Sequence, residues 1–279
     1  MAIFVPEIFR EALNAQIGVN LKMGLLATDV TDEVDEIKQA GDTVHFPVIA
    51  RVGDAEELSD NVETNPERIS MVDNKATVKE IGKTVRILDK EQIQIKGKAK
   101  NRVVEQLGEV MAKKIDFDLA DAIDKDVVLK VAAEEADRVT ISELESLMGL
   151  FGDQMDSDSF AGFVVNSKVA SLLFRMPEFV SATYTFSANG NGIVKNGLIG
   201  YYRAIPVYVS NNNTYDTSKN ECKTYLIKKK ALGYVFQKEI TVEEERMPKL
   251  RATDLTASSL VATKVLDTKG VAVLRKTIA

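Results

Sequence analysis

The sequence predicts an α+β fold that combines long strands, one long helix and a part in which helices and strands alternate. Residues 41–88 contain two runs with the apolar–polar alternation of strands. Residues 98–130 carry apolar residues three and four positions apart, which is the spacing of one helix face. Residues 131–233 alternate helix and strand patterns, and residues 234–279 return to strand patterns. We therefore expect an arm, a hairpin, a strut helix, an α/β part and a strand-rich tail, in that order.

The amino-acid composition and the net charge exclude several classes of protein. The chain has 279 residues, of which 45% are hydrophobic and 28% charged, and this balance excludes wholesale disorder. A net charge of -6 argues against a dedicated nucleic-acid binder, which usually has a basic surplus. Cys222 is the only cysteine, so no disulfide can form within the chain. Because the sequence shows neither a secretory signal nor an apolar run long enough to cross a membrane, we expect a soluble protein made in a cytoplasm.

Residues 1–40 are predicted to form an arm. Pro6 suits the first turn of a helix, and the apolar residues that follow at helical spacing are Ile8, Phe9, Leu13 and Ile17. Gly18 and Gly24 interrupt this pattern, and residues 29–38 are polar and charged. Because the arm has little apolar surface of its own to bury, we expect it to lie on something else.

Residues 41–88 predict a long two-stranded hairpin. Val44, Phe46 and Val48 alternate with polar neighbours, and residues 69–88 read as a second, mostly solvated strand. Residues 54–67, between the two strands, include no basic residue, and the acidic residues among them are Asp54, Glu56, Glu57, Asp60, Glu63 and Glu67. Since an isolated hairpin is barely stable in water, this one needs support, and no adjacent segment is an obvious candidate.

The helix expected at 98–130 has three distinct groups of side chains. Its apolar stripe consists of Val103, Val104, Leu107, Val110, Met111, Ile115, Leu119, Ala122 and Ile123. A basic cluster near its start, which opposes the helix dipole, consists of Lys96, Lys98, Lys100 and Arg102. That cluster is either solvated or bound to an anionic partner. For Asp116, Asp118, Asp121 and Asp124 we favour a solvated face over a paired-carboxylate site.

The remaining elements follow from local signals. Thr140, three residues before Glu143, predicts a capping box at a helix start. A strand at 160–165, a helix at 167–176 stopped by Pro177, and a glycine-rich loop at 181–200 come next. The further strands are expected at 201–209, 224–228, 234–242, 259–266 and 271–274, with a charged stretch at 243–249 and a turn at 267–270.

No residue pattern points to catalysis, a cofactor or a metal. His45 is expected to be a strand residue, and Cys222 lacks the basic or helix-start context of a reactive thiol. One histidine and one cysteine cannot complete the usual zinc sets. The remaining weak candidates are the glycines Gly190, Gly192, Gly197 and Gly200, which lack the Lys-Ser/Thr of a P-loop, and Asp153, Asp156 and Asp158, which lack the glycine and glutamate of a calcium loop.

Six stretches, in this order along the chain, carry a resemblance to a known family. They are 41–48 (Gly-Asp-Thr-Val-His-Phe-Pro-Val), 54–58 (Asp-Ala-Glu-Glu-Leu), 75–85 (Lys-Ala-Thr-Val-Lys-Glu-Ile-Gly-Lys-Thr-Val), 115–120 (Ile-Asp-Phe-Asp-Leu-Ala), 200–211 (Gly-Tyr-Tyr-Arg-Ala-Ile-Pro-Val-Tyr-Val-Ser-Asn) and 225–233 (Tyr-Leu-Ile-Lys-Lys-Lys-Ala-Leu-Gly). Together with the order of the elements, they resemble the tailed-bacteriophage major capsid protein with the Hong Kong 97-type fold.

The resemblance implies a domain plan and a function. It implies an N-terminal arm at 1–40, an extended hairpin at 41–88 lying on a neighbouring subunit, a peripheral domain from 89–131 with 234–279 that contains the spine helix, and an axial domain at 132–233. Such a chain assembles, as pentamers and hexamers, into the icosahedral head of a double-stranded DNA phage, in the host bacterial cytoplasm. It encloses the genome without reading its sequence. A nanocompartment shell of the same fold with protein cargo is the alternative, and a hydrolase using axial-domain aspartates is a weaker third.

The resemblance also suggests partners and one contact. Because this chain starts at Met1 and has only a short arm, we expect a separate scaffolding protein, and also a portal, but no membrane. We expect the acidic residues of the hairpin to dock on Lys96, Lys98, Lys100 and Arg102 of an adjacent subunit, with Lys228–Lys230 as the next candidate surface; the alternative is that both patches face solvent. No motif supports a lysine–asparagine cross-link.

Overall fold

The structure is a computed structural model that describes residues 20–31, 42–49, 68, 71–94, 99–133, 139–180 and 197–277. The strands are β1 Thr28–Asp29, β2 Thr43–Ile49, β3 Met71–Thr77, β4 Lys79–Leu88, β5 Leu129–Val131, β6 Phe160–Val165, β7 Leu198–Tyr202, β8 Ile205–Val209, β9 Tyr215–Asp216, β10 Glu221–Lys228, β11 Leu232–Met247, β12 Ala252–Val265 and β13 Val271–Thr277. The helices are α2 Asp89–Gln94, α3 Ala99–Asp126, α4 Ile141–Gly149, α5 Ser167–Leu173 and α6 Pro177–Val180, with short 3-10 helices at Gly152–Gln154, Ser157–Ser159 and Pro248–Leu250. None of these helices is long and apolar enough to cross a membrane.

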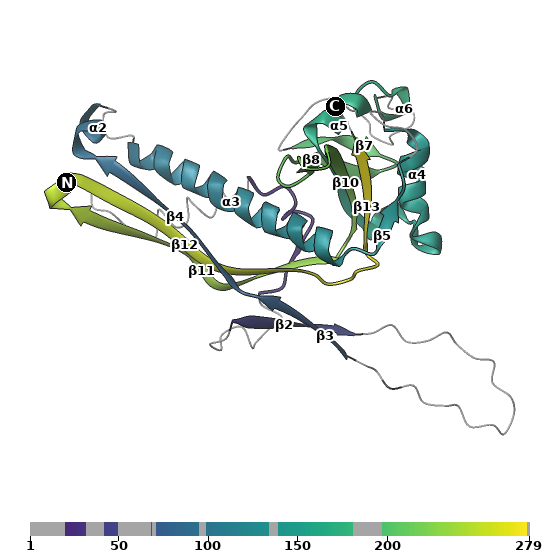
Figure 1. The fold of residues 1–279 in the computed structure, drawn as a ribbon, viewed down its shortest axis with the longest axis horizontal. Helices are drawn as coiled ribbons and strands as arrows, with labels where there is room; N and C mark the ends of the chain where they lie inside the picture. The colour runs from purple at the N-terminus through teal and green to yellow at the C-terminus, as the bar shows by residue number, and fades with distance from the viewer. Residues whose placement is uncertain are drawn as a thin grey trace, which may run out of the picture.

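One half of the molecule is a four-stranded sheet with the long helix α3 along one face (Figure 1). The strand order is β1-β11-β12-β4, with β1 parallel to β11 and the other pairs antiparallel. The 28 residues of α3 give it a length of about 42 Å. Its buried residues Leu107, Ile115 and Leu119 belong to one core with Ile81 of β4 and Leu255 of β12. The expected strut helix is therefore confirmed, although Val110 of its predicted stripe is exposed.

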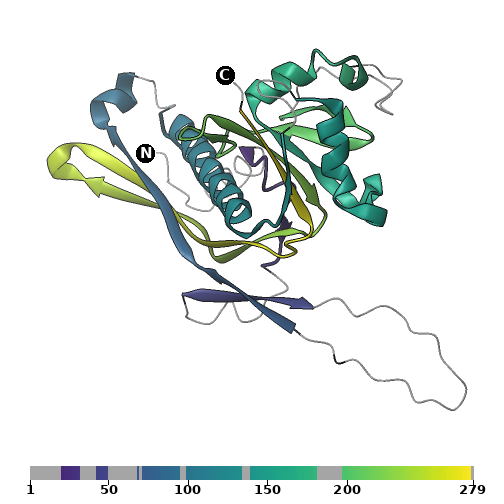
Figure 2. The ribbon, with the colours of Figure 1, turned by 45° about the vertical axis from the view of Figure 1, so that its right-hand side comes forward.

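The other half is a seven-stranded sheet in the order β5-β13-β10-β6-β8-β7, with β9 added beside β10. Helices α4, α5 and α6 lie beside this sheet (Figure 2). A second core joins them and contains Leu147 of α4, Val169 of α5 and Phe179 of α6. In the middle of this sheet, β10 is buried from Cys222 to Ile227, and the polar residues Lys223 and Thr224 are buried with its apolar ones.

Two long runs of the sequence divide between sheets in a way that the pattern did not predict. The second hairpin run splits at Val78, so that β3 pairs with β2 while β4 joins β12 in the four-stranded sheet. In the tail, β13 lies between β5 and β10 in the seven-stranded sheet, while its Val271 and Val273 share the core of α3. Both changes bury apolar residues, Ile81 and Ile87 in β4 and Val271 and Leu274 in β13.

Local predictions mostly hold, with corrections at several boundaries, since β11 continues through the charged stretch to Met247 and β12 already begins at Ala252. The capping box is present, since Thr140 Oγ1 accepts from the Glu143 N–H and the Glu143 carboxylate accepts from the Thr140 N–H. The helix expected at 167–176 ends at Leu173, and Pro177 begins α6. The single strand expected at 201–209 is wrong. It is a hairpin of β7 and β8 that turns at Arg203 and Ala204, whose φ angles are 48° and 67°. Without glycine or asparagine there, the turn had no sequence signal.

Candidate assembly interface

The root of the β2–β3 hairpin is fixed to the chain's own tail. Val44, Phe46 and Ala76 are buried in a small core with Val235 of β11 and Ala262 of β12. In addition, Asn74 Nδ2 donates to the carbonyl oxygen of Val265 at 2.8 Å. No adjacent segment was an obvious support for the hairpin, and its root is held instead by distant strands of the same chain. The support comes from residues nearly 200 positions later, which the sequence pattern could not reveal.

From this root the hairpin strands project beyond the four-stranded sheet (Figure 1, Figure 2). His45 lies on β2 and is exposed, on the opposite face from Val44 and Phe46, as expected of a strand residue. The acidic residues predicted to form the contact, Asp54, Glu56, Glu57, Asp60, Glu63 and Glu67, lie outside the described residues.

The predicted basic cluster is only half described. Lys96 and Lys98 lie outside the described residues, whereas Lys100 and Arg102 occupy the first turn of α3. Lys100 Nζ is 2.7 Å from Glu244 Oε1 of β11, so that its charge is matched within its own chain. Arg102 is exposed. Of the two described cations, Arg102 is thus better placed for contact with another subunit.

Two arginine–carboxylate pairs hold the same end of the four-stranded sheet together. Arg86 of β4 donates through Nε and Nη2 to Asp254 of β12, both at 2.8 Å. Arg246 of β11 donates to both oxygens of Asp89 in α2, at 2.6 and 2.7 Å. These hydrogen bonds from arginine lower the pKa of Asp254 and of Asp89. Bidentate pairs have a defined geometry, so they set the register of this end of the sheet.

The aspartates of α3 do not form the solvated face that we expected. The side chain of Asp116 is fully buried, and its carboxylate accepts N–H bonds from Lys22, Met23 and Gly24 at 2.9, 3.1 and 3.0 Å. Asn212 Nδ2 adds a weaker contact at 3.3 Å. Burial raises the pKa of Asp116, and these hydrogen bonds oppose the rise. This carboxylate therefore anchors the arm to the helix.

The neighbouring acidic residues tie α3 to other strands. Asp118, which is 3% exposed, accepts from Lys114 at 2.8 Å and from Lys79 of β4 at 3.3 Å. Asp124 contacts buried Lys223 of β10 and is 3.2 Å from Arg275 of β13. Because acidic residues near a helix C-terminus oppose the macrodipole, their number in this half of α3 was the one available hint that they have partners elsewhere.

The described residues provide no recognisable chemical centre. No group of three or more His, Cys, Asp or Glu among them could hold a metal. Cys222 is buried, which raises the pKa of its thiol, as the lack of an activating context predicted. Of the weak calcium-loop candidates, Asp156 is used locally, since its carboxylate accepts the N–H of Asp158 at the start of a 3-10 helix.

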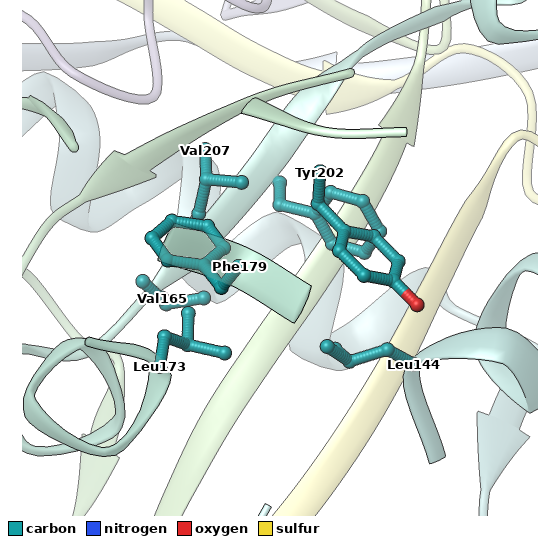
Figure 3. A pocket seen from close by; sticks show the side chains of 7 residues that line it. Leu144, Val165, Leu173, Phe179, Tyr202 and Val207 are labelled. Atoms are coloured by element: carbon teal, nitrogen blue, oxygen red, sulfur yellow. The ribbon is translucent and has the colours of Figure 1, made fainter. Parts of the chain in front are cut away.

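One cavity lies in the core of the half that contains the seven-stranded sheet (Figure 3). Its volume is about 10 Å³, which is room for roughly one water. The residues that line it are Leu144, Phe163, Val165, Leu173, Phe179, Tyr202 and Val207. A space this small and this apolar is a packing defect rather than a substrate site.

The chain is similar, over nearly its whole length, to solved structures from phages and to a virus-like particle. A structure from Mycobacterium phage Che8 matches with a TM-score of 0.68 at 19% identity, covering 93% of this chain and 92% of that one. The capsid structure of the cyanophage P-SCSP1u matches with a TM-score of 0.67 at 12% identity, covering 93% and 89%. A virus-like particle from Pyrococcus furiosus matches with a TM-score of 0.61 at 13% identity, covering 96% and 98%. At these identities the similarity establishes the fold.

A comparison of the sequence with models of protein families identifies the family of this chain. The family model described as phage capsid protein matches residues 72–274, which extends from β3 to β13. A search of curated proteins found no match. The match to the family model favours a phage shell over the nanocompartment alternative, and a capsid protein is a part of the virion. The chain therefore belongs to the phage capsid protein family and, with its Hong Kong 97-type fold, is a major capsid protein.

Proposed function

We propose that this protein builds the head of a double-stranded DNA tailed phage and that its hairpin links neighbouring subunits. The observation that carries the proposal is the β2–β3 hairpin, whose root is held by Phe46 and Asn74 while its strands leave the body of the subunit. A fixed root sets the direction of the strands before assembly. The ordering cost of forming the contact is then lower, because less freedom is lost on binding.

The acidic segment supplies the charge for this contact. Glu56 and Glu57 lie within residues 54–67, which include no cation, and the surface that we pair with them is Lys96, Lys98 and Arg102 of an adjacent subunit. Lys100 contributes less, because Glu244 of its own chain already binds it. Exposed ion pairs are worth about 0.2–1 kcal/mol each, so the repeated set supplies steering and register. Lys228, from the alternative surface, lies over the ring of Phe151 at 4.7 Å, which makes it less available.

The two halves of the subunit correspond to two domains with different roles in assembly. We assign the half with the four-stranded sheet and α3 to the peripheral domain, and the half with the seven-stranded sheet to the axial domain that groups subunits into pentamers and hexamers. The proposed partners are a separate scaffolding protein, a portal and packaged DNA that is not read by sequence, with assembly in the host bacterial cytoplasm. We assign no enzymatic activity, in keeping with the buried thiol of Cys222.

Charge reversal tests the hairpin contact. Glu56→Lys with Glu57→Lys should reduce the yield of closed shells at low salt, measured by light scattering and negative-stain microscopy. Lys96→Glu with Lys98→Glu should partly restore it. The matched control is Glu80→Lys with Glu105→Lys, which changes the charge equally at exposed positions outside the segment. Normal assembly of the first variant would show that the segment makes no electrostatic contact, and failure of the rescue would place the partner surface elsewhere.

The cargo separates a phage head from a nanocompartment. Purified particles should contain nucleic acid, measured by their absorbance ratio and by nuclease-resistant DNA. Particles that contain protein cargo without DNA would instead support the nanocompartment.

A further inference from the structure

The edge strands of the two sheets differ in their charge. On one side the four-stranded sheet ends in β4, which carries four charged residues, Lys79, Glu80, Lys83 and Arg86. Charged side chains on an edge strand keep other strands from pairing with it. The seven-stranded sheet ends in β7, which has neither a charged residue nor a proline, and no described strand other than β8 pairs with it. By the same principle, β7 is an edge to which another strand can be added.

Exposed apolar side chains and one acidic residue lie at the β7 edge. Tyr201 of β7 is 36% exposed, and Val180 of the adjoining helix α6 is 41% exposed. Glu178 of α6 lies close enough for its charge to act on the ring hydroxyl of the last residue of β7, and it forms no ion pair with a described residue. The cation that follows this strand, Arg203, already pairs with Glu145 of α4. The β7 edge is therefore apolar and carries an unmatched negative charge.

The other edge of the same sheet, at β5, has the complementary features. Val128, just before β5, is 69% exposed. Lys130 of β5 is exposed and forms no ion pair in the part of the chain that the structure describes. Four strands separate β5 from β7, which places the two edges of one subunit about 24 Å apart. Only a second copy of the chain can therefore bring a β5 edge to a β7 edge.

We propose that the β7 edge of one subunit docks on the β5 edge of the next, with Glu178 facing Lys130. Such a contact joins two different surfaces, and its repetition closes a ring when the rotation between subunits fits. Backbone groups of both edges gain partners, and Val128, Val180 and Tyr201 lose their contact with water. The inference rests on the proposed function and deepens it, because it names the surfaces that join axial domains into pentamers and hexamers.

Thiol cross-linking tests which edges meet. A chain with both Tyr201→Cys and Val128→Cys, assembled and treated with a short bismaleimide, should give a ladder of linked subunits that ends at five or six on a denaturing gel. Cys222, the only native thiol, is buried and sets a low background. Each single variant is the control and should stay monomeric, because each edge meets the other edge and not itself. A linked dimer from a single variant, or no linked species in normally assembled particles, would overturn the proposal.

Charge reversal gives a second readout that needs no engineered thiol. Glu178→Lys should lower the yield of rings and shells about five-fold at low salt, and adding Lys130→Glu should restore most of that yield. Glu105→Lys, at an exposed position on α3, is the control for the change in net charge. If Glu178→Lys assembles as well as Glu105→Lys, or if Lys130→Glu restores nothing, the two edges do not meet in this way. These results leave the proposed function standing as long as the native chain forms shells, and only a native chain without shells contradicts that function.

Discussion

The Asp116 carboxylate, in the middle of α3, binds the backbone of Met23 through an N–H···O bond of 3.1 Å, across 93 residues of sequence. The adjacent N–H groups of Lys22 and Gly24 point to the same carboxylate. Three consecutive backbone donors on one side chain form a small anion-binding site, which is filled here by the protein itself. The arm, the spine helix and, through Asn212, the half with the seven-stranded sheet therefore meet at one residue.

Asp116→Asn should weaken the attachment of the arm to α3. The amide keeps the size of the side chain but places an NH₂ group where donors already converge, leaving buried N–H groups without acceptors. We expect the free energy of unfolding to fall by about 1–3 kcal/mol, and hydrogen exchange at residues 22–24 to accelerate. The matched control on the same helix is Asp121→Asn. It removes only the pairing with Lys125 four residues away and should cost less than about 0.5 kcal/mol. Equal losses in the two variants would contradict a special role for Asp116.

The pH dependence of stability should have opposite signs at Asp116 and Asp254. Burial raises the pKa of Asp116, so the folded state holds a proton above the unfolded pKa of about 3.9, and the stability from this group falls as pH rises through that window. The stability difference between the native chain and Asp116→Asn should therefore grow from pH 7 to pH 4. The lowered pKa of Asp254 gives stability that is present above about pH 3.9 and lost below it. The stability difference between the native chain and Asp254→Asn should therefore shrink on acidification below pH 4. Chemical denaturation at a series of pH values measures both differences.

Lys223→Met should weaken the contact between α3 and the seven-stranded sheet. Lys223 is 4% exposed, and its ammonium group contacts the Asp124 carboxylate and the carbonyl oxygen of Asn213. Its loss removes one of the two cations beside Asp124 in the described structure, the other being Arg275, and we expect a cost of about 3 kcal/mol. The double variant with Lys223→Met and Asp124→Asn should lose less free energy of unfolding than the two single variants lose together, because the two residues are coupled. Strict additivity in this double-mutant cycle would show that the pair does not interact.

Phe46→Ala should release the hairpin root. Phe46 is 1% exposed, and truncating a buried phenylalanine typically costs about 3–5 kcal/mol. We expect faster proteolysis of the hairpin and a reduced yield of shells, even at temperatures where α3 remains helical by circular dichroism. His45→Ala, one residue away on the exposed face, is the control for an effect on the strand itself. If His45→Ala impaired assembly as much as Phe46→Ala, the buried root would not explain the loss.

Ala204→Gly should stabilise the turn between β7 and β8. Ala204 has a φ of 67°, a left-handed conformation that costs L-residues other than glycine about 1–2 kcal/mol. Glycine removes that strain but gains freedom in the unfolded chain, so we expect a net gain of about 0.5 kcal/mol in thermal or chemical unfolding. A loss of stability would mean that the alanine side chain makes a contact worth more than the strain.

Sequence patterns predicted the elements whose determinants are local. The capping box of Thr140 and Glu143 joins residues three positions apart, and the stripe of α3 repeats within each two turns. Such neighbours interact in the same way whatever the rest of the chain does, so the type and order of these elements could be derived before the structure. The proposed hairpin contact, from Glu56 to Lys98, rests on the same kind of sequence argument and stays a prediction.

The tertiary structure alone decided which strand joins which sheet and which charges are buried. An alternating run such as 71–88 can pair with any complementary edge, and only the packing of Ile81 and Ile87 under α3 directs its second half to β12. An aspartate on a helix has the same sequence signature in solvent as in a core. Asp116 is buried because three N–H groups from 92–94 residues earlier compensate its carboxylate, and the local pattern cannot say where in the chain such partners lie.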